Sequence, residues 1–320
     1  MSPMDRPADP GAARFLLPYP PSRIGGLPGG LPVAVWEGTG DPPADESLAE
    51  VEFFVIPYGR TDVAVALLPR MPRLRVVQSL SAGVDELVKY IPAGVVLCNA
   101  KGVHDASTAE LAVTLALASL RGIPGFIRAQ ETEEWLSGFH PALADRTVLL
   151  VGYGSIAAAA EDRLIPFECD ILRVARTART AARGPVHALS DLPELLPRAD
   201  IVVLTVPLTD DTRGLVDAGF LALMPDGALL VNVSRGAVVE TDALLAELRT
   251  GRLSTALDVT DPEPLPAGHP LWHAPNTLIS PHVGGNSSAF LPRALRLIRT
   301  QLLRYDAGEP LEHTVLPREL

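Results

Sequence analysis

Three side chains that can bind anions or exchange protons each follow a short apolar segment with the character of a β-strand: Arg235, Glu263 and His282. The carboxyl ends of parallel strands meet at one edge of a wound sheet, where ligands bind. Reduction of a 2-keto acid by a nicotinamide requires a cation for the carboxylate, an acid for the carbonyl oxygen and a group that orients the acid. We predict that Arg235, His282 and Glu263 fill these roles in that order, with Glu263 favouring an imidazolium at His282.

Each of these residues has a simpler interpretation when it is taken alone. Arg235 could be a solvated helix cap or surface ion pair, Glu263 a solvated carboxylate in a proline-rich loop, and His282 a hydrogen-bonded polar residue. Their positions at three successive strand ends favour the catalytic interpretation.

A glycine pattern precedes these residues in the chain. The apolar run 148–151 leads into Gly152, Tyr153 and Gly154, and an alanine-rich segment that includes Ala157 follows. Strand, glycine turn and helix in this order predict a pyrophosphate site, because Gly152 permits a tight turn, Gly154 a close backbone approach and Ala157 close helix packing. The alternative is a turn without a ligand. We expect Gly152, Gly154, Ser155 and Ile156 to contact a dinucleotide.

The residues after the second strand bear on the choice of cofactor. An enzyme that prefers NAD carries an acidic residue there, about 20 residues beyond the glycines. Here Arg176 takes that position and Thr177 and Arg179 follow, with no acidic residue until Asp191. Two guanidinium groups and a hydroxyl suit a 2′-phosphate, so we predict NADP(H) in preference to NAD(H). The alternative is a solvated basic turn.

Strand-like and helix-like segments alternate along the chain, which predicts an α/β fold with parallel, wound sheets. Residues up to about 31 are rich in Pro and Gly, and we expect irregular structure there. Expected helices cover 61–68, 85–90, 107–120 and 289–305, and 123–144 is expected to be less regular after Gly122 and Pro124. Expected strands cover 33–36, 52–57, 75–79 and 95–98, then six in a second domain: 148–151, 171–175, 201–206, 228–233, 254–259 and 277–280.

Composition limits the partners. The net charge is −11 and no basic patch with interleaved aromatic residues is visible, which argues against nucleic acid. No apolar run is long enough to span a membrane. Two cysteines and no visible signal peptide favour the cytoplasm. His269 and His273 have helical zinc spacing, but Pro270 lies between them, so we predict no metal site.

Together these segments resemble the D-isomer-specific 2-hydroxy-acid dehydrogenases. The resemblance covers nearly everything from Arg75 to Leu311 and rests on segments 81–85, 99–103, 108–110, 152–156, 207–209, 232–236, 256–259 and 280–284. It implies a catalytic triad of Arg235, Glu263 and His282, a contact of Asp258 with the nicotinamide carboxamide, and backbone donors to the substrate carboxylate from Ser81, Ala82 and Gly83. The family usually has glycine where Ala157 stands.

The resemblance also implies a Rossmann cofactor domain, residues 99–284, inserted into a flavodoxin-like substrate domain, residues 1–98 and 285–320. Pro207 and Thr212 are further expected cofactor contacts. Tyr58 and Leu80 are expected to line the pocket for the 2-substituent, which leaves glyoxylate, hydroxypyruvate and larger apolar keto acids open.

We also expect a homodimer, because the helix 107–120 is almost wholly apolar and Trp135 and Phe139 follow it; burial inside one subunit is the alternative. Two other functions compete with the reductase. A formate dehydrogenase would share the fold, but formate dehydrogenases of this family carry glutamine at the position of Glu263. A dinucleotide-sensing, corepressor-like protein would retain the triad without turnover.

Overall fold

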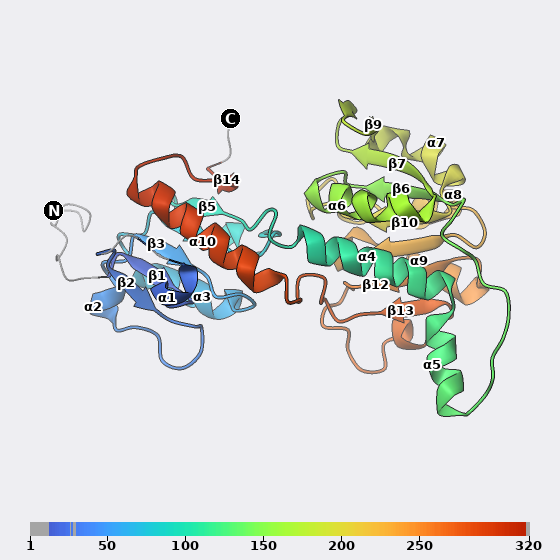
Figure 1. Ribbon diagram of the computed structural model, residues 1–320, viewed down its shortest axis with the longest axis horizontal. Helices are drawn as coiled ribbons and strands as arrows, with labels where there is room; N and C mark the ends of the chain where they lie inside the picture. The colour runs from blue at the N-terminus through green and yellow to red at the C-terminus, as the bar shows by residue number, and fades with distance from the viewer. Residues whose placement is uncertain (1–12, 26, 28–29, 318–320) are drawn as a thin grey trace. The chain divides into compact units, whose positions relative to one another are not determined.

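The computed structural model describes residues 13–25, 27 and 30–317. The chain divides into two units, one formed by Met1–His104 with Ser288–Leu320 and the other by Asp105–Ser287 (Figure 1). The chain passes from one unit to the other at 104/105 and at 287/288, a few residues later than the expected boundaries at 98/99 and 284/285. The first shifts because Ala100 N–H donates to the Ser81 carbonyl and keeps this segment with the first unit. The second shifts because Ser107 Oγ lies 2.6 Å from Ser287 Oγ within the second unit.

The first unit is a six-stranded sheet in the order β14-β5-β4-β3-β1-β2. All neighbours are parallel except β14, which pairs antiparallel with β5. The parallel strands follow the flavodoxin-like order 2-1-3-4-5. The strands are β1 (Phe15–Leu17), β2 (Val33–Val35), β3 (Phe53–Val55), β4 (Val76–Gln78), β5 (Val96–Cys98) and β14 (Thr314–Leu316), and the helices are α1 (Pro21–Ile24), α2 (Asp45–Leu48), α3 (Thr61–Leu67) and α10 (Phe290–Asp306).

Strand β1 corrects the expectation that the chain is irregular up to residue 31; residues 1–12, 26 and 28–29 of that stretch lie outside the described residues. Its three residues are fully buried and pair with β2 and β3. Leu16 packs on the face covered by α2 and α3, and Phe15 and Leu17 on the face covered by α10. The surrounding prolines and glycines hid this short run. The expected helix 85–90 is also wrong, because only Val88–Tyr90 forms a single 3-10 turn.

The second unit is an eight-stranded sheet in the order β13-β12-β11-β10-β6-β7-β9-β8. The run from β9 to β12 has the strand order 3-2-1-4-5-6 of the Rossmann fold. The strands are β6 (Thr147–Val151), β7 (Asp170–Ala175), β8 (Arg179–Ala181), β9 (Gly184–Ala188), β10 (Ile201–Leu204), β11 (Leu229–Asn232), β12 (Ser254–Leu257) and β13 (Thr277–Ile279). We expected six strands; the hairpin β8–β9 was missed because it is short and contains Gly184 and Pro185.

Helices cover both faces of this sheet. Val148 and Leu150 of β6 pack toward α4 (Asp105–Leu120) and α6 (Ser155–Leu164), and Leu149 and Val151 pack toward the opposite face. Burial on both faces explains why the strands are continuous apolar runs. Helices α7 (Leu192–Leu195), α8 (Ala218–Leu223) and α9 (Thr241–Thr250) cover that opposite face.

Helix α5 (Ile123–Glu131) corrects the expectation of irregular structure directly after α4. Pro124 stands in its first turn, where a fixed φ and a missing N–H favour a helix start. Within the described residues, no single helix is long and apolar enough to span a membrane. Helices α4 and α5 together have sufficient length and apolar composition, but they are bent by 64° relative to each other.

Candidate active site

The three predicted catalytic residues lie at one edge of the second unit. Strands β11, β12 and β13 are parallel neighbours, and Arg235, Glu263 and His282 follow their respective carboxyl ends. The site is thus built on adjacent strand ends of a single unit.

His282 and Glu263 form a hydrogen-bonded ion pair. His282 Nδ1 lies 2.5 Å from Glu263 Oε1, and the two side chains are 48% and 39% exposed. The hydrogen bond that His282 donates to Glu263 raises the pKa of His282 more than burial lowers it. Burial acts to raise the pKa of Glu263, but the hydrogen bond and charge of His282 outweigh it and lower that pKa. The pair therefore favours imidazolium beside carboxylate, with Nε2 of His282 on the side away from Glu263.

The backbone at His282 is held in a left-handed conformation, φ +52°. Asp258 fixes this conformation from the end of β12. Its carbonyl accepts the His282 N–H at 2.7 Å, and its carboxylate accepts Ser280 Oγ at 2.6 Å, Val283 N–H at 2.9 Å and Gly284 N–H at 2.8 Å. Asp258, the expected nicotinamide contact, is thus buried and engaged with the loop that carries His282.

Arg235 is positioned by the end of β11. Asn232 accepts hydrogen bonds from Ser234 and donates Nδ2–H to the Arg235 carbonyl at 2.9 Å. A Cβ on Gly236 would lie 1.9 Å from the Thr260 carbonyl oxygen, so only glycine fits directly after Arg235. The charge of Arg235 acts to lower the pKa of both Glu263 and His282, although the pKa of His282 stays raised because Glu263 outweighs it.

The glycine turn lies between β6 and α6. Gly152 has φ +100°, and a Cβ there would lie 2.6 Å from Val206 N, so no other residue fits. Gly154 caps α6, and Ser155 and Ile156 form its first turn. Ala157 is fully buried, which agrees with close packing of this helix on the sheet. The first N–H groups of a helix have no partner within the helix, so the start of α6 suits a pyrophosphate.

The basic residues predicted to select the cofactor flank the end of β7. Arg176 and Thr177 are exposed and directly follow this strand. Arg179 opens β8, and its Nη2 donates to the Tyr153 carbonyl in the glycine turn at 2.6 Å. The structure therefore brings Arg179 to the glycine turn, a contact that the spacing alone did not predict.

Pro207 and Thr212 lie in the loop after β10. Thr212 is buried, and its hydroxyl donates to the Pro207 carbonyl at 2.6 Å and accepts the Thr209 N–H at 2.8 Å. Thr212 shapes this loop and offers little surface of its own.

His269, one of the two histidines with zinc-like spacing, caps the 3-10 helix Pro270–His273 by accepting the Leu271 N–H at its Nδ1. The described part of the chain holds no cluster of three or more His, Cys, Asp or Glu side chains that could bind a metal ion.

The predicted substrate-binding residues belong to the first unit. Ser81, Ala82 and Gly83 follow β4, and Asn99 Nδ2–H donates to the Ala82 carbonyl at 2.9 Å. Leu80 is only 1% exposed, so its side chain offers little surface to a ligand.

Tyr58, by contrast, is partly exposed. It belongs to an aromatic cluster with His104 and Phe290, whose ring centroids lie 5.4 and 4.3 Å from that of Tyr58. Neither His104 nor Phe290 was singled out from the sequence, because both lie far along the chain from Tyr58.

Comparisons with known proteins agree with this geometry. The family model described as D-isomer specific 2-hydroxyacid dehydrogenase, NAD binding domain, matches residues 113–284, more than half of the chain. A glyoxylate reductase of Thermococcus litoralis is 31% identical over 294 residues, which cover 87% of this chain and 88% of the relative. The human glyoxylate reductase/hydroxypyruvate reductase is 34% identical over 250 residues, 74% of this chain and 76% of the relative.

Solved structures are similar over almost the whole chain. A D-isomer specific 2-hydroxyacid dehydrogenase from Xanthobacter autotrophicus Py2, in complex with NADPH and MES, has a TM-score of 0.79 at 32% identity and covers 96% of this chain and 99% of its own. An NADPH-dependent glyoxylate/hydroxypyruvate reductase from Sinorhizobium meliloti, in complex with NADP and sulfate, has a TM-score of 0.79 at 26% identity, with coverages of 95% and 98%. The predicted α/β fold class with a Rossmann domain is confirmed.

Proposed function

The chain belongs to the D-isomer-specific 2-hydroxyacid dehydrogenase family and is an NAD(P)-dependent dehydrogenase, and we propose that it interconverts a 2-keto acid and the D-2-hydroxy acid with NADP(H) as its preferred cofactor. The observation that carries this proposal is the hydrogen bond between His282 and Glu263, near Arg235. These residues and the glycine turn all follow the carboxyl ends of parallel strands, so they lie at the same edge of the sheet.

In the proposed reduction, Arg235 binds the substrate carboxylate and polarises the carbonyl oxygen. His282, charged through its bond to Glu263, donates the Nε2 proton to that oxygen, and Glu263 keeps the ring oriented. A nicotinamide cofactor, when bound, supplies the hydride. In oxidation the neutral His282 accepts the proton of the hydroxyl group.

The cofactor would be held by the second unit. We assign the pyrophosphate to the turn at Gly152 and Gly154 with the first turn of α6, including Ser155 and Ile156. Close fit at Gly152 supports this, because a side chain there would collide with Val206 N. Pro207 completes the proposed contacts. Thr212 and Asp258 are buried and hydrogen-bonded within the second unit, and we propose that they shape the cofactor site by holding the loops after β10 and β13.

Preference for NADP(H) rests on the end of β7, where Arg176 stands at the position of the usual acidic residue and Thr177 and Arg179 follow. Two structural relatives contain NADPH or NADP. A 2′-phosphate gains charge-assisted hydrogen bonds from such groups, whereas a carboxylate at this position would repel it.

For the substrate we propose a small 2-keto acid, with glyoxylate and hydroxypyruvate as the first candidates because relatives carry those names. Of the expected backbone donors Ser81, Ala82 and Gly83, the Ser81 N–H already donates to Ser79 Oγ at 3.0 Å, so we assign the substrate carboxylate to the N–H groups of Ala82 and Gly83. Tyr58, packed against Phe290, would contact the 2-substituent, and this apolar aromatic pair keeps larger apolar keto acids as the second class to test.

A panel of 2-keto acids tested with NADPH and NADH decides the proposal. Oxidation of NADPH by glyoxylate or hydroxypyruvate, with a higher kcat/KM than with NADH, is the expected result. Cofactor binding without turnover on any acid of the panel would contradict the enzyme assignment and favour a nucleotide-sensing protein.

We further propose a homodimer formed through α4, α5 and the segment after α5. Trp135 is 95% exposed, and Ile127 and Phe139 are also exposed on this segment. The apolar helix α4 is not buried on every side within one chain, since Leu111 and Leu117 remain only half-buried. Exposed apolar area of this kind marks interaction surfaces. Sedimentation at micromolar concentration should give a dimer that Trp135→Ala weakens and Trp272→Ala leaves intact; a wild-type monomer would contradict the assignment.

A further inference from the structure

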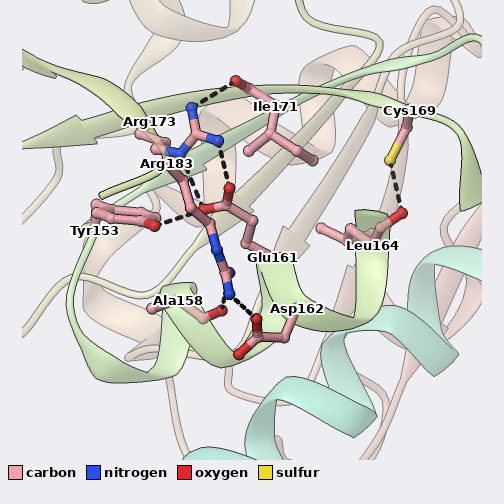
Figure 2. Close-up of polar contacts among 9 residues, drawn as sticks. All are labelled: Tyr153, Ala158, Glu161, Asp162, Leu164, Cys169, Ile171, Arg173 and Arg183. Carbon is pink, nitrogen blue, oxygen red and sulfur yellow. Dashed lines mark hydrogen bonds and ion pairs between the residues drawn. The ribbon is translucent and has the colours of Figure 1, made fainter. Parts of the chain in front are cut away.

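A charged network is buried beside the glycine turn. Glu161 of α6 is 0% exposed and Arg173 of β7 is 9% exposed. Figure 2 shows their side chains converging with the ring of Tyr153. Tyr153 Oη donates to Glu161 Oε2 at 2.5 Å, and Arg173 Nε donates to the same oxygen at 2.9 Å. Arg173 Nη2 bonds Glu161 Oε1, and Nη1 donates to the Ile171 carbonyl at 3.2 Å. All five polar side-chain atoms of the ion pair, two oxygens and three nitrogens, therefore have partners.

This network stands where apolar side chains would be expected. The other buried positions of α6 are Ala157, Ala160 and Leu164. Burial acts to raise the pKa of Glu161, but hydrogen bonds from Arg173 and Tyr153 outweigh it and lower that pKa, so the carboxylate stays charged. Apolar residues of similar volume are often as stabilising as a buried ion pair, or more so. Stability alone thus gives no reason for these charges, and a positional role does.

The network holds the turn from several sides. Tyr153 lies between Gly152 and Gly154, and its N–H donates to the Val174 carbonyl of β7 at 2.8 Å. Its own carbonyl accepts from Arg179, and its hydroxyl is held by Glu161. The guanidinium carbon of Arg173 lies 5.8 Å from the centroid of the Tyr153 ring. Turn, α6, β7 and β8 are thereby joined at one residue.

Arg183 adds a second tie between the hairpin and α6. Figure 2 shows its guanidinium directed at Asp162, with which it forms an ion pair, and at the Ala158 carbonyl, to which it donates at 3.5 Å. Within the described residues no hydrogen bond or ion pair engages Arg176. The hairpin is thus attached to α6 and the turn through Arg179 and Arg183, while Arg176 at its start stays available.

We propose that Glu161 is a positioning residue for the cofactor: with Arg173 and Tyr153 it fixes the distance between the glycine turn and the end of β7. This inference rests on the proposed function, because the turn would bind the pyrophosphate and Arg176 the ribose phosphate of one NADP(H) molecule. A ligand that spans both places needs them at a fixed separation, and a ligand that occupies one of them does not. Preorganisation of this kind contributes to affinity by lowering the ordering cost of binding.

The test compares a spanning ligand with a fragment. The double variant Glu161→Leu with Arg173→Met removes both charges at similar volume. Binding of NADPH and of adenosine 2′-monophosphate, which lacks the 5′-phosphate and so reaches only the end of β7, is measured by calorimetry without any keto acid. We expect NADPH affinity to fall about 10-fold or more and fragment affinity to change less than about 3-fold, with thermal stability retained. The control Arg146→Met removes an ion pair with Asp200 at the other end of β6 and should change neither affinity.

A merely structural network would lower both affinities together with the unfolding temperature, and unchanged NADPH binding in the double variant would also overturn the inference. If that variant does not fold, Tyr153→Phe removes a single hydroxyl and should still lower NADPH affinity about 2–10-fold, the range for one hydrogen bond; wild-type affinity would contradict the proposal.

Failure of the proposed preference for NADP(H) can be distinguished from failure of the positioning role of Glu161. A wild-type protein that binds NADH better would refute the assignment of NADP(H), and the same comparison made with NADH and adenosine, which carries no phosphate, would then test the positioning role of Glu161.

Discussion

Two carboxylate-centred ion pairs in the second unit differ in ways that separate catalysis from positioning. Glu263 and His282 are roughly half-exposed, and His282 can gain or lose a proton. Glu161 and Arg173 are buried, and a guanidinium stays charged at all accessible pH values. The exposed pair is suited to exchanging a proton with a substrate, whereas the buried pair can only hold its neighbours in place. Similar charges thus serve two purposes according to burial and to the partner of the carboxylate.

The largest effect should follow loss of the proposed acid. His282→Ala removes proton donation to the carbonyl oxygen, and keto-acid reduction should fall roughly 100-fold or more in kcat. His273→Ala alters an exposed histidine of the same unit and should leave kcat unchanged. Steady-state kinetics of both variants test the catalytic side of the comparison; equal activities would remove His282 from the mechanism.

The next largest effect should be a difference in unfolding free energy between loss of the Glu161–Arg173 pair and loss of the Glu263–His282 pair. Glu161→Leu leaves the Arg173 charge buried without its partner, which costs about 3–5 kcal/mol of unfolding free energy. The same substitution at Glu263 should cost less than about 1 kcal/mol, because its half-exposed partner His282 can be solvated or lose its proton. Denaturant unfolding of the two variants measures the difference. Similar losses would mean that burial does not distinguish the pairs.

A smaller, selective effect is expected at the end of β7. Arg176→Asp places an acidic group where the ribose 2′-OH of NAD binds, so the ratio of kcat/KM for NADPH over NADH should fall about 10-fold or more. Unfolding free energy should stay within about 0.5 kcal/mol of wild type, because Arg176 is exposed. Arg198→Asp, an exposed substitution in the same unit, provides the control. An unchanged ratio would place 2′-phosphate recognition elsewhere.

Strand ends and the glycine turn were predictable from sequence because continuous apolar runs and glycine spacing are local features. The residues Arg235, Glu263 and His282 needed only the rule that parallel strand ends share an edge. Strand β1 was missed because three apolar residues amid prolines carry too little periodic signal. Hairpin β8–β9 was missed because Gly184 and Pro185 are poor strand formers.

The buried network was also missed, although a signal was present. Glu161 lies on the stripe of α6 that carries Ala157, Ala160 and Leu164, and Arg173 interrupts an apolar strand. Charges at both core positions indicate a buried pair. Their meeting at Tyr153 depends on the packing of α6 against β7, which no local pattern encodes. The cluster of Tyr58, His104 and Phe290 was hidden for the same reason.

The pH dependence of keto-acid reduction tests the central claim most directly. His282 must be protonated to act as the acid, and Glu263 raises its pKa above the usual 6.5. We predict that kcat/KM is highest at low pH and falls as pH rises through this raised pKa, while oxidation of the hydroxy acid rises over the same range. Glu263→Gln removes the charge that raises the pKa and should move the fall to lower pH, whereas Asp261→Asn in the same loop should not. A profile that is identical in wild type and Glu263→Gln would contradict the assignment of this pair as the proton donor and its orienting carboxylate.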